Sequence, residues 1–346
     1  MSAITERALR ALPKVELHRH LDGSIRVQTI LDLVRLHNLD VGTRDPARIA
    51  SLAVIPSPLR DLGEVLKRFD LLRAVLVGYD AIRRVAFENV EDAYRDGVQL
   101  AELRFAPAYI AHGKSLSWDE IIEGVLDGVS QGMSAYPVQV GLIGIAARTY
   151  GREPNGLALE ELIRYRRGSH RSGDRIYGFD LADAEEPSDM PAWLPLVRRA
   201  REAGMGITVH TGESTSAEHL KLAIRTYGPD RIGHGIKAWG DGEAVDTLRD
   251  RGIPLEICPT SNWITSSVPT LREHPIRSLK DAGVEVSINS DDPNLMGIDL
   301  VHEYQVCVEH HGFDLLELAR LNRGALEASF VDREIKEWVG ARLEGE

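Results

Sequence analysis

The segment ITVHTGESTSAEHLKLAIRTYGPDRIGHGI (residues 207–236) contains two short apolar runs separated by an amphipathic stretch. The runs at 207–210 and 231–236 have the length and the β-branched composition of buried strands. Between them, apolar side chains recur at helical spacing, at Leu220, Ala223, Ile224 and Tyr227. A strand, a helix and a second strand in close succession are typical of a parallel α/β fold.

The same alternation extends toward both ends of the chain and gives eight predicted strands. They are Val15–His20, Val98–Phe105, Val138–Ala146, Ile176–Ala182, Ile207–His210, Arg231–Ile236, Ile253–Cys258 and Val284–Ser290. Eight strands separated by helical segments predict an α/β fold of the (β/α)8 TIM-barrel type. A doubly wound open sheet is the alternative, but it requires a glycine-rich phosphate turn of the form GxGxxG, which the sequence lacks.

We predict one domain over residues 1–346, with the barrel core at about 14–293 and C-terminal helices at about 300–346. The interval between the first two strands, about 21–97, is longer than an ordinary connection. We predict that it forms a lid-like insertion over the mouth of the barrel, where functional loops gather.

Three parts of this insertion differ in pattern. A helix is predicted near Ile25–His37, and a loop over residues 43–61 (TRDPARIASLAVIPSPLRD). A single amphipathic stretch is predicted from Leu62 to Val77.

The composition argues against several classes of protein. The 346 residues include 41 Lys and Arg against 53 Asp and Glu, a formal net charge of −12, which disfavours a nucleic-acid partner. No apolar run approaches the roughly 18 residues that a membrane span requires, and the first residues lack the apolar region of a signal peptide. Two cysteines are too few for a disulfide framework. We therefore expect a cytoplasmic protein with no membrane association and no obligate protein partner.

The motif VELHRHLDG (residues 15–23) places His18 and His20 two positions apart at the end of the first predicted strand. Because side chains alternate along a strand, both imidazoles are expected to face the barrel interior. Two aligned histidines are a common start of a divalent-metal site. For this motif taken by itself, a chance pair of histidines in a buried strand is the alternative.

Three other predicted strand ends also carry ionisable residues, namely His210 in ITVHTGE, His234 in RIGHGI, and Asp291 with Asp292 in VSINSDDP. Burying such groups unpaired is costly, so four such strand ends are hard to explain by core packing. At the C-terminal face of a barrel they are typical of a catalytic centre. The remaining histidines are expected at surface or capping positions: His37, His112, His170, His219, His274, His302, His310 and His311.

His18, His20, His210 and Asp291 are the economical ligand set for one catalytic Zn²⁺ per chain, since they leave a position open for water. Zinc lowers the pKa of bound water to about 7 and so supplies hydroxide at neutral pH. Binuclear barrel hydrolases often bridge two metals with a modified lysine at the end of the fourth strand. Residues 176–186 contain no lysine, which favours a single metal.

Three further residues are assigned roles by their chemistry. Glu213 suits proton transfer, although it also suits the N-terminus of the following helix. His234 suits orienting or deprotonating the attacking water, or stabilising an oxyanion. Asp292 suits binding a polar edge of the substrate or supporting His234, or stabilising the turn before Pro293. These groups support hydrolysis or addition–elimination at an electron-poor ring carbon, and they leave the substrate open.

At these residues the sequence resembles the adenosine deaminase family of the metal-dependent amidohydrolase superfamily, most closely its bacterial members. The matching motifs are ELHRHLDGSIR, RRVAFENVEDAYRDG, ELRFAP, HTGE, RIGHGI, CPTSN and INSDDP. They occur in family order between residues 14 and 293, and HEY at 302–304 extends the likeness. Seven ordered motifs over most of the chain are far more specific than a single HxH pair.

The resemblance implies a barrel that binds one Zn²⁺ through the four ligands named above. It implies that Glu213 protonates N1 of the purine while water adds at C6, that His234 assists the water, and that Asp292 binds N7. By the same likeness, Asp22 accepts a hydrogen bond from the sugar 5′-hydroxyl, and His20 also borders the substrate. Ammonia and a 6-oxopurine nucleoside are the implied products.

One position departs from the family pattern. After the fourth strand the family usually has DLAG, in which the glycine N–H meets N3 of the purine, whereas this chain has DLAD with Asp183. A backbone donor survives any substitution, so binding through Asp183 is one expectation. The alternative is that the carboxylate alters the pocket or that the backbone takes another path.

The leading hypothesis is hydrolytic deamination of adenosine and 2′-deoxyadenosine to inosine and 2′-deoxyinosine in purine salvage. The alternatives are a 5′-modified adenosine such as 6-aminodeoxyfutalosine, a menaquinone precursor, and free adenine. In the insertion, Arg60, Lys67 and Arg68 could meet an anionic 5′ substituent, although such charges are usually solvated. A zinc-containing binding protein without catalysis would be expected to lack Glu213 or a ligand, and every such position is filled.

Overall fold

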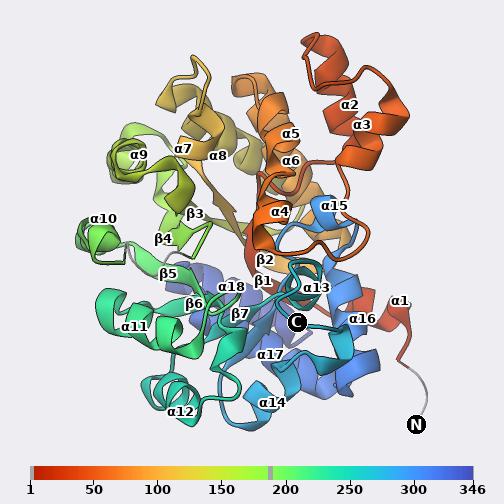
Figure 1. Cartoon of the computed structure of the whole chain (residues 1–346), viewed down its shortest axis with the longest axis vertical. Helices are drawn as coiled ribbons and strands as arrows, with labels where there is room; N and C mark the ends of the chain where they lie inside the picture. Colours follow the sequence, from red (N-terminus) through yellow and green to blue (C-terminus); the bar gives the residue numbers. More distant parts are fainter. Residues whose placement is uncertain (1–3, 186–189, 346) are drawn as a thin grey trace.

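Eight parallel strands pair in chain order in the computed structural model of the protein, which describes residues 4–185 and 190–345 (Figure 1). They are β1 Lys14–His20, β2 Val98–Phe105, β3 Gln139–Ala147, β4 Ile176–Ala182, β5 Gly206–Thr211, β6 Arg231–His234, β7 Leu255–Ile257 and β8 Val286–Ile288. The two outer strands meet where N of His20 donates to O of Asp291 at 2.8 Å and N of Asp291 donates to O of His18 at 3.1 Å. The sheet is therefore a nearly closed TIM barrel, as predicted.

All eight predicted strands are present, with differences at their ends. β6 stops at His234, two residues before its predicted end, because His234 and Gly235 have left-handed φ angles of 63° and 65°. β7 and β8 begin later than predicted, because N of Ile253 and N of Val284 donate back to carbonyls of the preceding helices. Local backbone geometry at the strand ends therefore set the limits that apolar composition alone could not.

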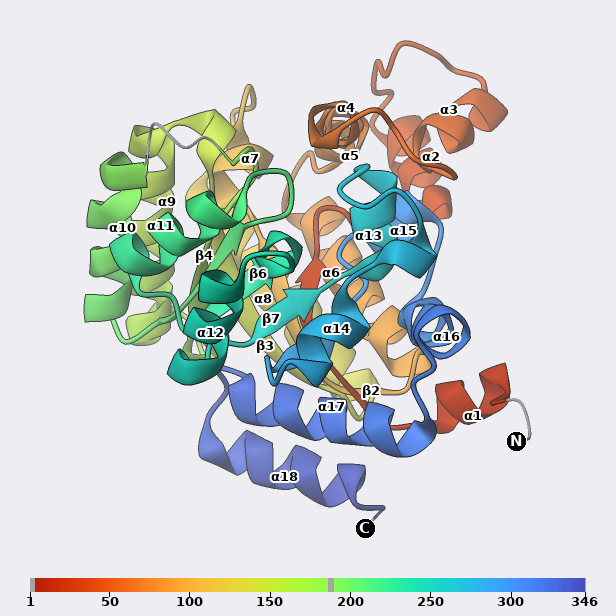
Figure 2. The same cartoon turned by 60° about the horizontal axis from the view of Figure 1, so that its bottom comes forward.

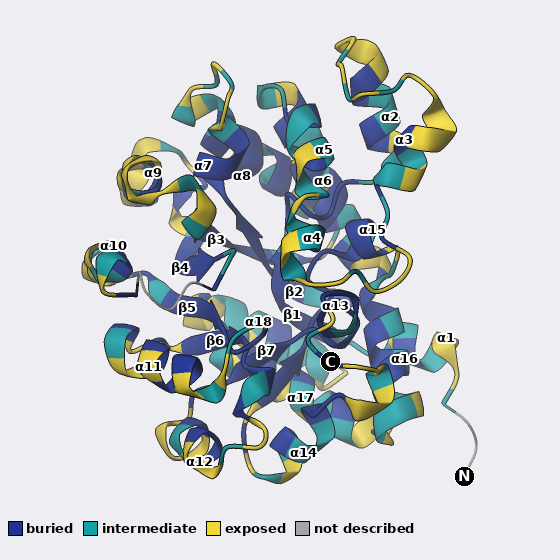
Figure 3. Ribbon diagram, viewed as in Figure 1, coloured by how far each residue is buried: buried dark blue, intermediate teal, exposed yellow. Residues whose placement is uncertain are grey.

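Helices surround the barrel and connect successive strands, and exposed residues lie mainly on their outer faces (Figure 3). They are α1 Glu6–Ala11, α2 Val27–Leu36, α3 Pro46–Leu52, α4 Leu62–Leu66, α5 Phe69–Val75, α6 Tyr79–Arg95, α7 Pro107–Ala111, α8 Trp118–Ala135, α9 Arg152–Arg164, α10 Met190–Glu202, α11 Ala217–Tyr227, α12 Gly242–Arg251, α13 Pro259–Ile264, α14 Ile276–Asp281, α15 Pro293–Met296, α16 Leu300–His311, α17 Leu315–Ala328 and α18 Arg333–Leu343. Within the described residues, none of these helices combines the length and the apolar character that crossing a bilayer requires.

The connection from β1 to β2 contains helices α2 to α6, and it differs from the prediction in two places. The segment predicted as a loop contains α3, because Asp45 caps this helix by accepting the N–H of Ala47 at 3.0 Å and Pro46 occupies its first turn. The stretch predicted as one helix is divided into α4 and α5, with Lys67 and Arg68 between them. Leu66 and Phe69 of α4 and α5 line the same cavities as the strand ends described below.

The N-terminal ends of the strands are covered by α17 and α18 (Figure 2). Apolar side chains of the strands pack there against these helices in a separate buried cluster that includes Leu17, Leu100, Leu326 and Val339. This end of the barrel is closed by packing, so the C-terminal ends of the strands form the accessible face.

Candidate active site

Four side chains converge at the C-terminal face of the barrel. His18 and His20 come from β1, His210 comes from β5, and Asp291 follows β8. One donor atom from each of the four lies within 4.8 Å of the others. The closure of the barrel between β1 and the end of β8 is what places Asp291 beside the two β1 histidines.

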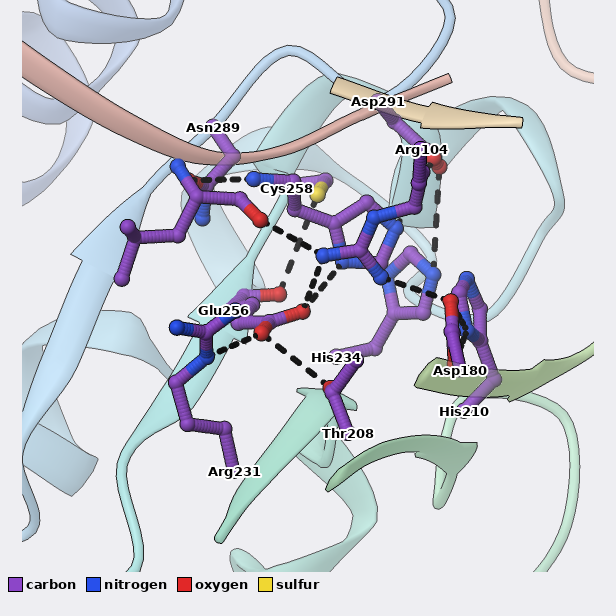
Figure 4. A network of polar contacts seen from close by, with 12 residues as sticks. Arg104, Asp180, Thr208, His210, Arg231, His234, Glu256, Cys258, Asn289 and Asp291 are labelled. Carbon is purple, nitrogen blue, oxygen red and sulfur yellow. Dashed lines mark hydrogen bonds and ion pairs between the residues drawn. The ribbon is translucent and has the colours of Figure 1, made fainter. Parts of the chain in front are cut away.

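Buried carboxylates orient two of these imidazoles. Nδ1 of His18 lies 2.9 Å from Oε2 of Glu256. Nδ1 of His210 lies 3.1 Å from Oδ1 of Asp180 (Figure 4). Because each carboxylate accepts the Nδ1 proton, the Nε2 lone pairs face the centre of the cluster. A carboxylate behind the imidazole is a common support for a metal ligand.

The cluster meets the requirements of a divalent-cation site. Nε2 of His18 is buried without a hydrogen-bond partner among the described residues, although Oδ1 of Asp291 is 3.1 Å away. Two acceptors at that distance without hydrogen-bond geometry are expected of two ligands that face one cation. Burial lowers the pKa of His210 to about 4 and that of His20 well below its ordinary value. Three imidazoles with one carboxylate suit zinc chemically.

Glu213 lies just beyond β5. It is buried, and it lines a small cavity together with His20, His210 and Asp291. Burial raises the pKa of its carboxyl group above the ordinary value, which favours the protonated form. Its Oε1 accepts hydrogen bonds from Oγ1 of Thr265 at 2.9 Å and from Nδ2 of Asn262 at 3.3 Å. The loop that carries Glu213 is held from behind by Glu185, which accepts the N–H groups of residues 212, 213 and 214.

His234 ends β6 with a left-handed φ of 63°, a conformation that a non-glycine residue adopts at some energetic cost. Its Nε2 lies 3.6 Å from Oε2 of Glu213 and 3.8 Å from Oδ2 of Asp291, so it faces the cluster. Its Nδ1 lies 3.1 Å from Nδ2 of Asn262 on the opposite side of the ring. The strained backbone therefore turns the imidazole toward the cavity.

Asp292 is buried beside the metal cluster, and its Oδ1 has no hydrogen-bond partner among the described residues. Burial and the adjacent Asp291 raise the pKa of its carboxyl group well above the ordinary value. Gly23 makes room for this side chain, because a Cβ atom at that position would lie 1.6 Å from Oδ1 of Asp292. A buried polar atom without a protein partner is one that a substrate can bind.

Two adjoining cavities define the space for a substrate. A cavity of about 60 Å³ borders the metal cluster together with Glu213, His234 and Asp292. A larger cavity of about 320 Å³ contains Asp22 and shares His20 and Asp183 with the first. Asp22 accepts the N–H of residue 106 at 3.2 Å, and burial raises its pKa to about 6. Eight of the nine sequence-predicted site residues thus line these two adjoining cavities, and His18 lies beside them without lining either.

Asp183 keeps the backbone conformation that glycine favours, with φ of 76°. Its carboxylate accepts the N–H of Thr149 at 3.2 Å and the N–H of Ala184 at 2.7 Å. Its carbonyl accepts a hydrogen bond from Nη1 of Arg148 at 3.1 Å. The additional carboxylate therefore binds the wall of the cavity formed by Thr149 and Tyr150, and the chain follows a path that glycine also permits.

Sequence reasoning missed the polar side chains that support the site. Arg104 donates to Asp180 at 2.8 Å and to Glu256 at 2.7 Å, and so connects the carboxylates behind two of the histidines (Figure 4). Asn262 and Glu185 were also missed. For Arg104, Asp180 and Glu256, the available signal was a charged residue within a buried strand. Asn262 ends the CPTSN motif, but the motif alone assigned it no role, and the spacing around Glu185 gave no signal.

Two of the histidines expected at the surface are buried. His219 lies under the β5 end with its Nδ1 3.0 Å from Oγ1 of Thr211, and His274 lies with its Nε2 3.1 Å from Oδ1 of Asn262. The expected surface position was wrong for both residues, because a helical or loop position says nothing about which other elements pack over it. His274 accepts the N–H of Ile276, the first residue of α14, which agrees with the expected capping role.

A parallel barrel with three histidines and an aspartate at the ends of β1, β5 and β8 is an arrangement typical of barrel hydrolases, and these four residues could hold a divalent cation. The model of the adenosine deaminase family matches residues 13–344. The adenosine deaminase of Erwinia tasmaniensis is 41% identical over 332 residues, which cover 96% of this chain and 98% of the relative. The chain therefore belongs to the adenosine deaminase family and is a hydrolytic deaminase, as the motifs predicted.

Solved structures show the same fold with different substrates. The Arabidopsis N6-mAMP deaminase is 27% identical, with a TM-score of 0.84 and coverage of 98% of this chain and 100% of that chain. The adenine deaminase of Arthrobacter aurescens has a TM-score of 0.86 at 24% identity, covering 96% of this chain and 98% of that chain, which shows the fold alone. Substrate choice must therefore be argued from the cavities of this chain.

Proposed function

We propose that the protein deaminates adenosine and 2′-deoxyadenosine to inosine and 2′-deoxyinosine in cytoplasmic purine salvage. The supporting observation is the pair of connected cavities. The smaller one holds the acid–base groups beside the metal cluster, and the larger one offers Asp22 to a group attached to the reacting ring. A free base would leave the larger cavity empty, which makes adenine a weaker candidate.

His18, His20, His210 and Asp291 would hold one Zn²⁺. When bound there, zinc supplies hydroxide at neutral pH because it lowers the pKa of its water. The Nδ1 partners Glu256 and Asp180 keep two of the ligands turned toward that position.

The remaining residues act on the purine and on the attacking water. Glu213, with its raised pKa, delivers a proton to N1 and so makes C6 more electrophilic. His234 directs Nε2 toward the oxygen that adds at C6. The raised pKa of Asp292 favours its protonated carboxyl group, which donates from the partnerless Oδ1 to the lone pair of N7. Loss of ammonia from C6 then leaves the 6-oxopurine.

The larger cavity favours a neutral sugar over a 5′-phosphate. Its lining contains three carboxylates, Asp22, Asp70 and Asp183, against one ammonium group, Lys67. A phosphate placed there would be repelled by like charges. The helices α4 and α5, which contribute Leu66 and Phe69 to both cavities, are proposed to act as the lid over them.

A 5′-modified adenosine such as 6-aminodeoxyfutalosine is the second candidate. It is favoured by the aromatic side chains Phe69, Tyr109 and Tyr150 in the larger cavity, together with Lys67. These groups could bind an aromatic carboxylate carried on the 5′ carbon.

The test compares kcat/KM of the zinc-loaded protein for adenosine, 2′-deoxyadenosine, AMP, adenine and 6-aminodeoxyfutalosine. We expect adenosine and 2′-deoxyadenosine to lead and AMP to be among the poorest. A tenfold or larger preference for the 5′-modified substrate would replace the first proposal by the second. Activity on AMP equal to that on adenosine would contradict the argument from cavity charge.

A further inference from the structure

Asn262 of α13 lies between the two side chains proposed to act on substrate and water. Its Nδ2 is 3.1 Å from Nδ1 of His234 and 3.3 Å from Oε1 of Glu213. Its Oδ1 is 3.1 Å from Nε2 of His274. All four side chains are buried, so the direction of each hydrogen bond matters.

The direction of the chain of hydrogen bonds is set by a backbone amide. N of Ile276 donates to Nδ1 of His274 at 3.1 Å, and an amide N–H can only donate. Nδ1 of His274 is therefore unprotonated. Burial lowers the pKa of His274 to about 3, so the ring is neutral and its one proton is on Nε2. That proton is donated to Oδ1 of Asn262.

The opposite orientation of the Asn262 amide is disfavoured at His274. It would put the NH₂ group against the Nε2 proton of His274, two donors facing each other. With the orientation described, the two hydrogens of Nδ2 have one acceptor each, on His234 and on Glu213.

We propose that Asn262, oriented by His274, is a positioning residue that places both protons of the active site, on Nε2 of His234 and on Oε2 of Glu213. Nδ1 of His234 accepts from Asn262, so the proton of the neutral ring is on Nε2. Oε1 of Glu213 accepts from both Asn262 and Thr265, so the carboxylic proton is on Oε2. Nε2 and Oε2 are 3.6 Å apart.

This placement refines the roles given under the proposed function, on which it rests. His234 offers a proton at Nε2 as a hydrogen-bond donor to the attacking oxygen, and it does not act there as a base. Glu213 presents its proton from the oxygen that is free of Asn262 and Thr265. Neither side chain needs to rotate before it meets the substrate.

The first test reads the protonation of His234 without substrate. Zinc-loaded protein labelled with ¹⁵N-histidine is studied by long-range ¹H–¹⁵N NMR, and His234 is assigned by the signal that disappears in His234→Gln. We expect an unprotonated Nδ1 and a protonated Nε2. A proton on Nδ1, alone or together with one on Nε2, would overturn the proposal, whichever nucleoside the enzyme prefers.

The second test compares two substitutions of His274. His274→Leu removes the donor to Oδ1 of Asn262, and we expect kcat to fall about tenfold with little change in KM, the size of effect typical of one lost hydrogen bond. His274→Gln supplies an amide N–H in the same direction and is expected to restore most of kcat and the wild-type His234 spectrum. Equal kcat and unchanged His234 spectra in both variants would contradict the proposal.

Discussion

Both ends of the barrel bury charged or ionisable side chains, but the two ends differ in whether these side chains have hydrogen-bond partners. Near the N-terminal end, Arg231 donates to Glu102 at 2.6 Å, to Glu256 at 2.7 Å and to the carbonyl of residue 328 at 2.8 Å. At the C-terminal end, Nε2 of His18 and Oδ1 of Asp292 have no hydrogen-bond partner among the described residues. Paired charges hold the structure together, whereas buried atoms left without a protein partner indicate where a cation and a substrate bind.

The backbone shows the same contrast. Three residues at the C-terminal face, Asp183, His234 and Asp291, have left-handed φ angles of 76°, 63° and 60°. Non-glycine residues adopt this conformation only where the surrounding structure imposes it. The C-terminal end of the barrel therefore combines the two unpaired atoms named above with strained backbone at these three residues.

The largest expected effect is on chemistry at the C-terminal end. Glu213→Gln keeps an acceptor for Thr265 and Asn262 but removes the carboxylic proton. We expect kcat to fall about 10³-fold, as for loss of a general acid, with unchanged zinc content and no loss of thermal stability. Zinc content is measured by atomic absorption and stability by calorimetry. Turnover near the wild-type rate would refute the proton-transfer role.

Arg231→Met changes the N-terminal end of the barrel. We expect it to lower the free energy of unfolding and to leave catalysis intact. The substitution leaves Glu102 buried without its guanidinium partner, so we expect about 3 kcal/mol less stability in denaturant unfolding. The matched control is Arg333→Met, whose pair with Glu337 is exposed and should contribute nothing measurable.

Glu256, behind His18, also loses its hydrogen bond from Arg231. It keeps Arg104 as a partner at 2.7 Å. At temperatures where the variant is folded, KM for adenosine should therefore be unchanged. A large rise in KM would show that Arg231 also affects substrate binding, which would contradict this prediction.

Gly23→Ala tests whether the unpaired oxygen of Asp292 is functional. The added Cβ would displace the Asp292 carboxyl group, and we expect kcat/KM to fall on the order of 10²-fold through misplacement of a binding group. Zinc content should stay close to that of the wild type. Gly156→Ala in α9, where a Cβ would have no heavy atom within 4 Å and which lines neither cavity, is the control. Equal kcat/KM in the two variants would contradict the role of Asp292 in binding the substrate.

The smallest effect is expected at Asp183. Asp183→Gly relieves the left-handed strain but loses the hydrogen bonds to Thr149 and Ala184, so the change in stability should be within about 1 kcal/mol. Because the backbone path is one that glycine permits, kcat for adenosine should be little changed, while a looser wall at Thr149 and Tyr150 should admit 5′-extended substrates more readily. Steady-state kinetics with adenosine and 6-aminodeoxyfutalosine check both points. Loss of activity on adenosine alone would make Asp183 itself a substrate ligand.

The eight strands and the convergence of His18, His20, His210 and Asp291 were predictable from the sequence because both follow from local periodicity. His18 and His20 share a face by strand alternation, and His210 and Asp291 mark strand ends that a parallel barrel must bring to one side. The seven ordered motifs likewise identified the family.

Helix α3 and the buried His274 were not predicted, for two different reasons. For α3 the sequence held a local signal, the capping residue Asp45 followed by Pro46. The prediction relied on apolar periodicity, which does not include capping residues. His274 had no local signal, because its burial depends on packing against α13.

The sequence by itself therefore determined the barrel, the family and the residues that can hold a metal, since each depends on spacing within one element or on the order of elements. Only the tertiary structure decided that Asn262 joins Glu213, His234 and His274, that Glu185 supports the Glu213 loop, and that Asp183 binds the cavity wall. These contacts join residues on different elements, and whether two polar groups meet in hydrogen-bond geometry depends on how the elements pack.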